Sequence, residues 1–128
     1  KYRRGGTTQS ANIVLHSDGN VTSGNATVAK TLTAADTETI GFSARHLTVL
    51  IEAQGTTADG EVSCELNDAA QGTTLTVKNG QGYNVYAWAF PLQNPAISNK
   101  IEVVVGGGAG MNSRNFEIRA VIIKPKVA

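Results

Sequence analysis

The strongest constraint on the fold is the regular interruption of short apolar runs by turn-forming residues. Between Ala11 and Lys124, about nine runs rich in β-branched and aromatic residues are separated by Gly, Asn, Asp and Pro. None of these runs has the 3.6-residue period of an amphipathic helix. The pattern predicts an all-β protein, built as an antiparallel two-layer β-sandwich of about eight to nine strands.

The chain divides into a short polar start and one long patterned region. Residues 1–10 contain two glycines and three basic residues, Lys1, Arg3 and Arg4, without apolar periodicity. They are predicted to form an extended N-terminal arm that contacts a neighbouring subunit or another partner. Residues 11–128 fit a single β-sandwich domain with a core of its own. Because the first residue is Lys1 rather than Met, we expect a processed or truncated product.

Apolar alternation also predicts which side chains form the core. The run from Leu47 to Ala53 is almost continuously apolar, which is typical of a central strand covered on both faces. The single cysteine, Cys64, excludes an intrachain disulfide and is interpreted as a small buried hydrophobe. The predicted core consists of Leu47, Val49, Ile51, Val62, Cys64, Leu66, Leu75, Val77, Ile101, Val103, Phe116 and Ile118.

Turn chemistry predicts the connections between these runs. Residues 17–20 read Ser-Asp-Gly-Asn, a tight turn, and Ala34 to Asp36 could form a single helical turn. The Asn79-Gly80 pair predicts a β-hairpin. Residues 106–110, four glycines and one alanine, predict a flexible loop.

The most aromatic run spans Tyr83 to Phe90, and its two faces differ in bulk. One face carries the small residues Val85, Ala87 and Ala89, which suit a tightly packed core. The other carries Tyr86 and Trp88 together with Phe90. Because an exposed aromatic area usually marks a contact surface, we predict that Tyr86 and Trp88 meet another subunit or a glycan.

Charge limits the partners. The charged fraction is 16 % and the net charge is +1, so the domain is no polycation. Any contact with nucleic acid is expected to be weak and confined to the basic arm. No stretch is long and apolar enough for a membrane span, and the sequence shows no signal peptide.

No residue pattern predicts catalysis or a cofactor. Neither His16 nor His46 has a partner at metal-ligand spacing. Asp18, Asn20 and Asp59 lie in or beside turns without the spacing of a calcium loop, so ordinary turns are the interpretation. No serine lies in a nucleophile elbow, and the glycine loop lacks the Lys-Ser/Thr ending of a phosphate loop. We therefore predict no catalytic residue, no metal and no cofactor.

Carboxylates lie on or at the start of several predicted strands, where surface salt bridges are the default. A glycosidase would need two of them facing one cleft, which the sequence does not show. These residues are Glu52, Glu61, Glu65, Glu102 and Glu117.

The span from His46 to Lys124, roughly two-thirds of the chain, resembles jelly-roll β-sandwiches found among carbohydrate-binding modules and phage virion proteins. The segments that carry the resemblance are residues 47–55, 60–67, 72–83, 101–105 and 112–118. The last of these is similar to the closing strand of small calcium-dependent xylan-binding modules, which carry an acidic loop and an Arg-Asp pair there. Here the loop is glycine-rich and the pair reads Arg114-Asn115, so the acidic calcium ligands are missing. The resemblance implies a jelly-roll-like fold and leaves the function open.

These observations favour a non-catalytic structural protein of a virion or extracellular filament, such as a small capsid, capsid-decoration or fibre subunit. It would assemble as a homo-oligomer or with other structural subunits, through the basic arm and the aromatic face. The alternative is a carbohydrate-binding module of an extracellular protein, with a glycan as partner. A large closed assembly would support the first, and retention on a glycan column the second.

Overall fold

The computed structural model describes residues 8–39, 42–43, 46–92 and 97–125. Lys1, Arg3 and Arg4 lie outside these residues, so their predicted contact role stays a prediction. The predicted arm boundary at residue 10 is wrong, because the first strand begins at Thr8, which pairs with Pro125. Residues 8–10 are polar and show no apolar alternation, so the sequence did not indicate a strand there. Their hydrogen-bonding partners are residues 123–125 of β11, near the other end of the chain.

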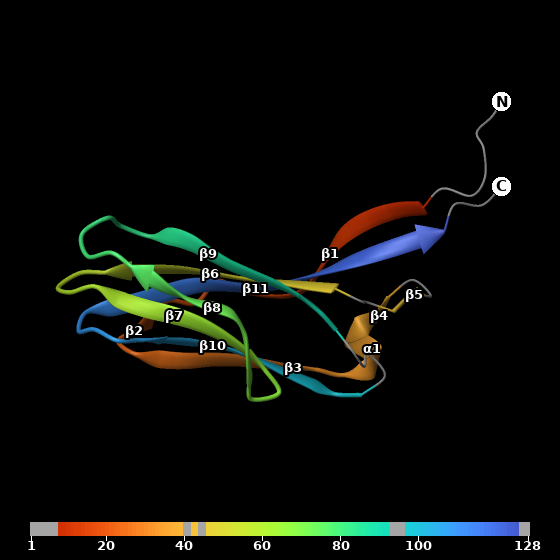
Figure 1. Ribbon diagram of the computed structural model, residues 1–128, viewed down its shortest axis with the longest axis horizontal. Coiled ribbons are helices and arrows are strands. Elements are labelled where there is room, and N and C mark those ends of the chain that lie inside the picture. The colour runs from red at the N-terminus through yellow and green to blue at the C-terminus, as the bar shows by residue number, and fades with distance from the viewer. Residues whose placement is uncertain (1–7, 40–41, 44–45, 93–96, 126–128) are drawn as a thin grey trace, which may run out of the picture.

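Two antiparallel sheets face each other (Figure 1). A five-stranded sheet has the order β1-β11-β6-β9, with the short β2 paired to β11, and a four-stranded sheet has the order β3-β10-β7-β8. A small hairpin, β4-β5, follows the single helical turn. The elements are β1 (Thr8–Asp18), β2 (Thr22–Ser23), β3 (Ala26–Leu32), α1 (Ala34–Thr37), β4 (Glu38–Thr39), β5 (Phe42–Ser43), β6 (His46–Gly55), β7 (Gly60–Leu66), β8 (Ala69–Val77), β9 (Asn84–Pro91), β10 (Asn99–Gly106) and β11 (Met111–Pro125).

The strand connections are those of a jelly roll. Of the eight long strands, only β7 and β8 follow each other within one sheet, and all other successive pairs cross between the sheets. The β7-β8 turn consists of Asn67 and Asp68, both with positive φ, as a two-residue hairpin turn requires. The all-β, jelly-roll-like sandwich predicted from the sequence is therefore confirmed.

One turn was recognised correctly but assigned to the wrong connection. Asn79-Gly80 does not close a hairpin, because β8 and β9 belong to different sheets. Gly80 has the expected positive φ of 78°, and its N–H donates to the carbonyl of Gly55. The pair thus turns the chain from one sheet to the other.

The core lies between the sheets and follows the predicted alternation. All twelve predicted core residues are buried or, for Leu66 and Leu75, partly buried against the core cluster. The structure adds further buried residues that sequence alternation did not select: Leu32, Ala53, Trp88, Phe90, Leu92, Val105, Met111 and Ala120.

The predicted helical turn forms as α1 and is capped at its start. The Thr33 N–H donates to the Asp36 carboxylate at 2.8 Å, and the Asp36 N–H donates to the Thr33 hydroxyl at 3.3 Å. These reciprocal bonds satisfy amide groups that the first turn of a helix leaves unpaired.

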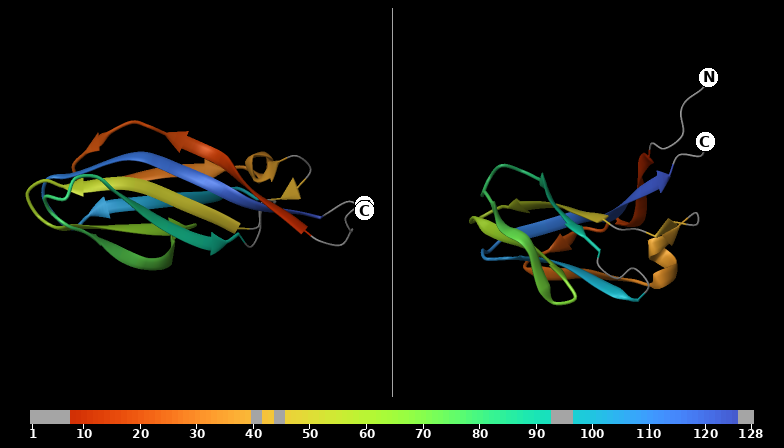
Figure 2. Two further views of the ribbon diagram at one scale, coloured as in Figure 1. Left: turned by 90° about the horizontal axis from the view of Figure 1, so that it is seen from above. Right: turned by 45° about the vertical axis from the view of Figure 1, so that its right-hand side comes forward.

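Both described ends lie at the same end of the sandwich. The outer parts of β1 and β11 continue past the other strands as a two-stranded ribbon (Figures 1 and 2). The loops that follow β6, β8 and β10 gather at the opposite end.

Candidate functional site

The aromatic strand β9 presents its large residues to the core, so the predicted orientation is wrong. Trp88 and Phe90 are 5 % and 4 % exposed, and Tyr86 packs against the core cluster. Trp88 is accommodated because its indole N–H donates to the carbonyl of Thr73 at 3.0 Å, which satisfies its polar atom in the interior. A buried Trp88 is not a contact platform, and the predicted contact role of the Tyr86–Trp88 face is corrected accordingly.

The small residues of β9 therefore face the solvent. Val85 is 60 % exposed, and Ala87 and Ala89 are exposed too. In the sheet register, Val85 lies beside Glu52 and Ala87 beside Leu50, both on β6. The short aliphatic side chains of β9 therefore form a strip along the β9 edge of the outer face of the five-stranded sheet.

A depression of about 230 Å³ opens on this outer face. Its aliphatic part comes from β6 and β9, and its polar part from β1, β11 and the end of β6. We call it the sheet-face groove; its lining residues are Ser17, Leu50, Ile51, Glu52, Val85, Asn115, Glu117 and Arg119.

A β-bulge in β11 forms one end of the groove. The register between β11 and β6 shifts between Arg114 and Glu117, and Asn115 within it adopts a left-handed φ of 54°. A bulge re-aims side chains, and here two successive residues reach the same carboxylate. Arg114 Nε donates to Glu52 Oε1 at 2.8 Å, and Asn115 Nδ2 donates to Glu52 Oε2 at 2.9 Å.

Tyr83 contacts Arg114 beside this end of the groove. The Arg114 guanidinium carbon lies 3.8 Å from the centroid of the Tyr83 ring, a cation–π distance. Arg114 is thus held between a carboxylate and an aromatic ring, while its side chain remains 40 % exposed. The guanidinium is fixed in position and still accessible to a ligand.

Hydrogen bonds keep Glu52 ionised. The Asn115 amide first, and then the Arg114 guanidinium, lower the pKa of Glu52 against a smaller opposing effect of desolvation. Each oxygen of Glu52 therefore accepts a hydrogen bond from a side chain of β11.

A second ion pair forms the other polar wall. Arg119 Nε donates to Glu117 Oε2 on the same strand, and the two side chains are 44 % and 23 % exposed. Since each glutamate of the groove has its own arginine partner, the groove is close to electrically neutral.

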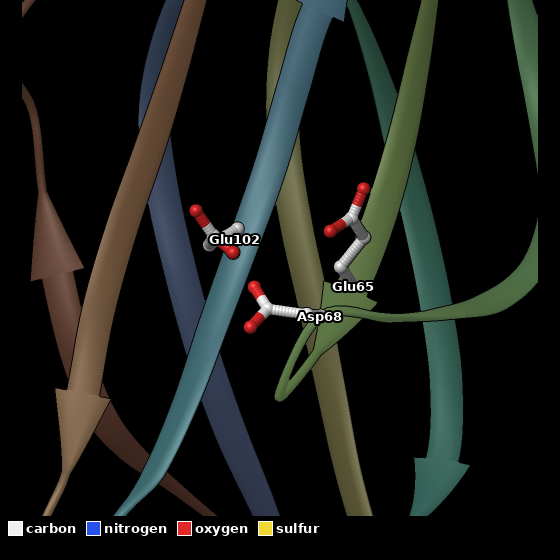
Figure 3. A group of neighbouring side chains, drawn as sticks. All are labelled: Glu65, Asp68 and Glu102. Atoms are coloured by element: carbon white, nitrogen blue, oxygen red, sulfur yellow. The ribbon is translucent and has the colours of Figure 1, made fainter.

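The carboxylates Glu65, Asp68 and Glu102 meet on the other sheet (Figure 3). Glu65 on β7 and Glu102 on β10 are direct neighbours in the register, and one oxygen of each of the three lies within 4.8 Å of the others. Lys100 Nζ lies 2.8 Å from Asp68 and 3.4 Å from Glu102. The Lys100 ammonium lowers the pKa of Asp68 and compensates part of this negative charge.

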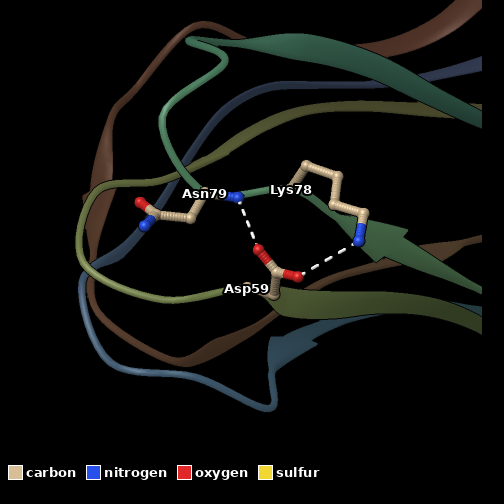
Figure 4. A network of polar contacts seen from close by, with 3 residues as sticks. All are labelled: Asp59, Lys78 and Asn79. Atoms are coloured by element: carbon tan, nitrogen blue, oxygen red, sulfur yellow. Dashed lines mark hydrogen bonds and ion pairs between the residues drawn. The ribbon is translucent and has the colours of Figure 1, made fainter.

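Asp59, a turn residue with a possible ligand oxygen, has a structural role instead (Figure 4). Its carboxylate accepts the Asn79 N–H at 2.8 Å and lies 3.3 Å from Lys78 Nζ. The first of these bonds is the larger cause of its lowered pKa. Asp59 therefore ties the start of β7 to the end of β8.

The glycine-rich connection between β10 and β11 is held by hydrogen bonds. The hydroxyls of Thr56 and Thr57 donate to the carbonyls of Gly110 and Ala109, both at 2.8 Å. A Cβ at Gly108 would lie 2.2 Å from the Asp59 carbonyl oxygen, so glycine allows this loop to approach its neighbour closely. The loop is no phosphate cradle, because β11 and not a helix follows it.

The remaining candidates lie at separate places. His16 makes an edge-on ring contact with Phe116, with centroids 5.5 Å apart. His46 is the first residue of β6. Asp18 closes a local turn by accepting the Asn20 N–H at 2.9 Å. Cys64 is buried, which raises the pKa of its thiol to about 12.

Solved structures of carbohydrate-binding modules are similar to this architecture. A family 35 carbohydrate-binding module from an environmental isolate superposes with a TM-score of 0.50 and 22 % identity, over 82 % of this chain and 73 % of that chain. The CBM22-1 xylan-binding domain of Xyn10C from Paenibacillus barcinonensis superposes with a TM-score of 0.52 and 10 % identity, over 92 % of this chain and 98 % of that domain. The chain shares their jelly-roll fold. No protein-family model and no curated protein sequence matches it.

These findings overturn the expected role as a virion or filament subunit. The two solved structures described above are carbohydrate-binding modules, and such a module was the alternative interpretation of the sequence. The predicted aromatic contact face, on which the assembly role partly depended, belongs to the core.

Among the described residues, no helix is long and apolar enough to cross a bilayer.

Several residues of the groove were considered in the sequence, but no sequence pattern indicated that they lie together. Glu52 and Glu117 were interpreted as surface carboxylates, and Arg114-Asn115 was noted only as a departure from a family pattern. Ser17 was noted only as part of a turn. Arg114 and Glu52 are 62 residues apart, so no local pattern could have joined them.

Proposed function

We propose that this chain is a non-catalytic carbohydrate-binding module of an extracellular protein, and that the sheet-face groove binds the glycan. One observation carries the proposal: an aliphatic floor and a wall of fixed hydrogen-bonding side chains meet in one depression. A pyranose ring presents apolar C–H faces and hydroxyl edges, so it needs both kinds of surface. Ligand sites typically combine apolar lining with a few well-placed polar groups.

The likeness to the two carbohydrate-binding modules supports this proposal through the shared fold. A fold alone does not decide a function, so the argument rests on the chemistry of the groove. Glu117, Arg119 and Asn115 supply acceptors and donors on one wall, while Leu50 and Val85 supply the floor. The pairing of each glutamate with an arginine favours a neutral glycan over a strongly charged one.

The character of the floor also suggests the physical form of the glycan. Every aromatic side chain whose burial the structure describes is buried or half-buried. A flat row of exposed rings, which would suit a crystalline polysaccharide surface, is therefore missing from the described residues. We expect binding to single soluble chains, by hydrogen bonds and aliphatic contact.

Affinity electrophoresis in gels that contain soluble xylan, mannan or β-glucan tests the proposal. At least one polysaccharide should retard the unmodified protein. Val85→Lys places a long charged side chain on the floor of the groove at a 60 % exposed position, so folding should be unaffected. It should weaken the retardation at least about tenfold, which corresponds to about 1.4 kcal/mol.

Thr27→Lys is the matched control, because Thr27 is exposed on β3 of the other sheet and the charge change is the same. It should leave the retardation unchanged. If the Val85→Lys variant is retarded as strongly as the unmodified protein, the binding site lies elsewhere. The same conclusion follows if Thr27→Lys weakens the retardation as much as Val85→Lys does. No retardation by any of the three polysaccharides would contradict the proposed class of ligand.

A further inference from the structure

The edge strand β8 is unusually compatible with pairing to another chain. It lies at the end of the four-stranded sheet and pairs only with β7. Its nine residues, Ala69–Val77, include no charged residue and no proline, and six of them are exposed. Charged residues, prolines and bulges are the usual means of keeping an edge strand from pairing with another chain. Of these three, β8 has only the bulge.

The bulge interrupts β8 in its middle. Val62 pairs with Leu75 and Cys64 pairs with Gln71, so the three residues Gly72, Thr73 and Thr74 face the single residue Ser63. Gly72 has a φ of 67°, which L side chains rarely adopt. The strand is therefore not flat at this point, and a regular ladder with a second strand cannot run through it.

Trp88 holds this bulge from the opposite sheet. Its indole N–H donates to the Thr73 carbonyl at 3.0 Å, so this oxygen is directed at β9 and not at an incoming strand. A Cβ at Gly72 would lie 3.3 Å from Trp88 Cδ1, which shows how closely the indole approaches the bulge. Trp88 is 5 % exposed and fixed by the core, so it is a rigid support.

We propose that the Trp88–Thr73 hydrogen bond maintains the β8 bulge and thereby prevents β8 from pairing with β8 of a second copy. The partner is a second copy because two antiparallel β8 strands bring no like charges together and are related by a two-fold axis. Released from the indole, residues 72–74 can straighten, and the edge then offers a continuous uncharged ladder. This inference does not depend on the proposed glycan site, which lies on the outer face of the other sheet.

Trp88→Phe tests the proposal, because phenylalanine keeps most of the buried volume and lacks the N–H. Sedimentation velocity over a range of concentrations measures self-association. The variant should associate at a concentration at least about tenfold lower than the unmodified protein does. Association at the same concentration as the unmodified protein would overturn the proposal.

Two lysine substitutions identify the surface involved. Thr76→Lys adds a charge at an exposed position of β8, opposite Glu61, and Thr27→Lys adds the same charge on β3, the other edge of the same sheet. In the Trp88→Phe background, Thr76→Lys should restore the monomer and Thr27→Lys should not. Equal rescue by both, or by neither, would contradict pairing through β8.

Two further variants separate the proposal from a general loss of stability. Ile118→Val removes one methylene from the core on β11 and should leave the protein monomeric. Gly72→Ala disturbs the bulge directly, through the strained φ and the contact with Trp88, and should associate as Trp88→Phe does. If Trp88→Phe fails to fold by circular dichroism, Gly72→Ala carries the test. A Gly72→Ala variant that folds and stays monomeric would overturn the proposal, as would association of Ile118→Val.

Discussion

Glu52 on β6 and Arg114 on β11 lie directly opposite each other in the sheet register, and Arg114 Nε donates to Glu52 Oε1 at 2.8 Å. The bulge that follows Arg114 brings Asn115 to the other oxygen of the same carboxylate. One acidic side chain thus fixes two residues at the end of the groove, and this relationship makes the groove sensitive to the ionisation of Glu52.

Glu52 should contribute a pH-dependent part of the stability. Because Asn115 and Arg114 lower its pKa in the folded state, its contribution is complete above the unfolded value of 4.5 and is lost as the pH falls through the lower folded value. Glu52→Gln should therefore reduce stability at neutral pH by about 1 kcal/mol, a typical value for a half-exposed charged pair. Thermal unfolding across the pH range should show the two proteins converging in acid. A difference that stays constant with pH would show that the charge of Glu52 is not responsible.

Trp88→Ala should destabilise the folded monomer, in addition to releasing the β8 bulge as Trp88→Phe does. The indole is 5 % exposed and its N–H is bonded inside the protein, so truncation leaves a cavity and an unpaired carbonyl. The expected loss in urea unfolding is about 3–5 kcal/mol, typical of buried aromatic truncation. A loss below about 1 kcal/mol would instead match a surface position.

Gly108→Ala should destabilise the end of the sandwich where the loops gather. The added Cβ would lie 2.2 Å from the Asp59 carbonyl oxygen, and a backbone atom cannot move away cheaply. Overpacking of this kind costs about 1–3 kcal/mol. Gly19→Ala is the matched control, because its Cβ would lie an ordinary 3.6 Å from Asn115 Oδ1. Thermal unfolding should separate the two variants, and equal melting temperatures would contradict the close approach of the loop.

Cys64 should be inert to thiol reagents in the native protein. Its side chain is 1 % exposed, and burial raises the pKa of the thiol to about 12, so the reactive thiolate is scarce at neutral pH. A chromogenic disulfide reagent should react only as fast as the protein unfolds, and at once in denaturant. Rapid reaction of the folded protein would show that β7 opens locally.

Local periodicity was sufficient for the core and for the fold class, because β6, β7 and β10 alternate with one clearly apolar side. It failed on β9, where both faces are apolar and periodicity does not say which one is inside. The decisive contact is the hydrogen bond between Trp88 and Thr73, which belong to different sheets.

The arm boundary and the groove escaped prediction for a related reason. Thr8 is part of a strand because it pairs with Pro125. Glu52 is part of the candidate site because it accepts hydrogen bonds from Arg114 and Asn115. Such pairings depend on strand order, which residue patterns within one segment do not contain. The Asn79-Gly80 turn illustrates the same limit, because turn chemistry was recognised while the sheets that it joins were not.

The most direct test of glycan binding at the sheet-face groove is a titration of the isotope-labelled protein with a soluble oligosaccharide, followed through backbone amide chemical shifts. The polysaccharide that retards the protein in gels supplies the oligosaccharide. The account predicts shifts that saturate and that concentrate on Leu50, Glu52, Val85, Asn115, Glu117 and Arg119. Shifts confined to the loop end of the sandwich or to the β3-β10-β7-β8 sheet would contradict it, as would a spectrum that does not change.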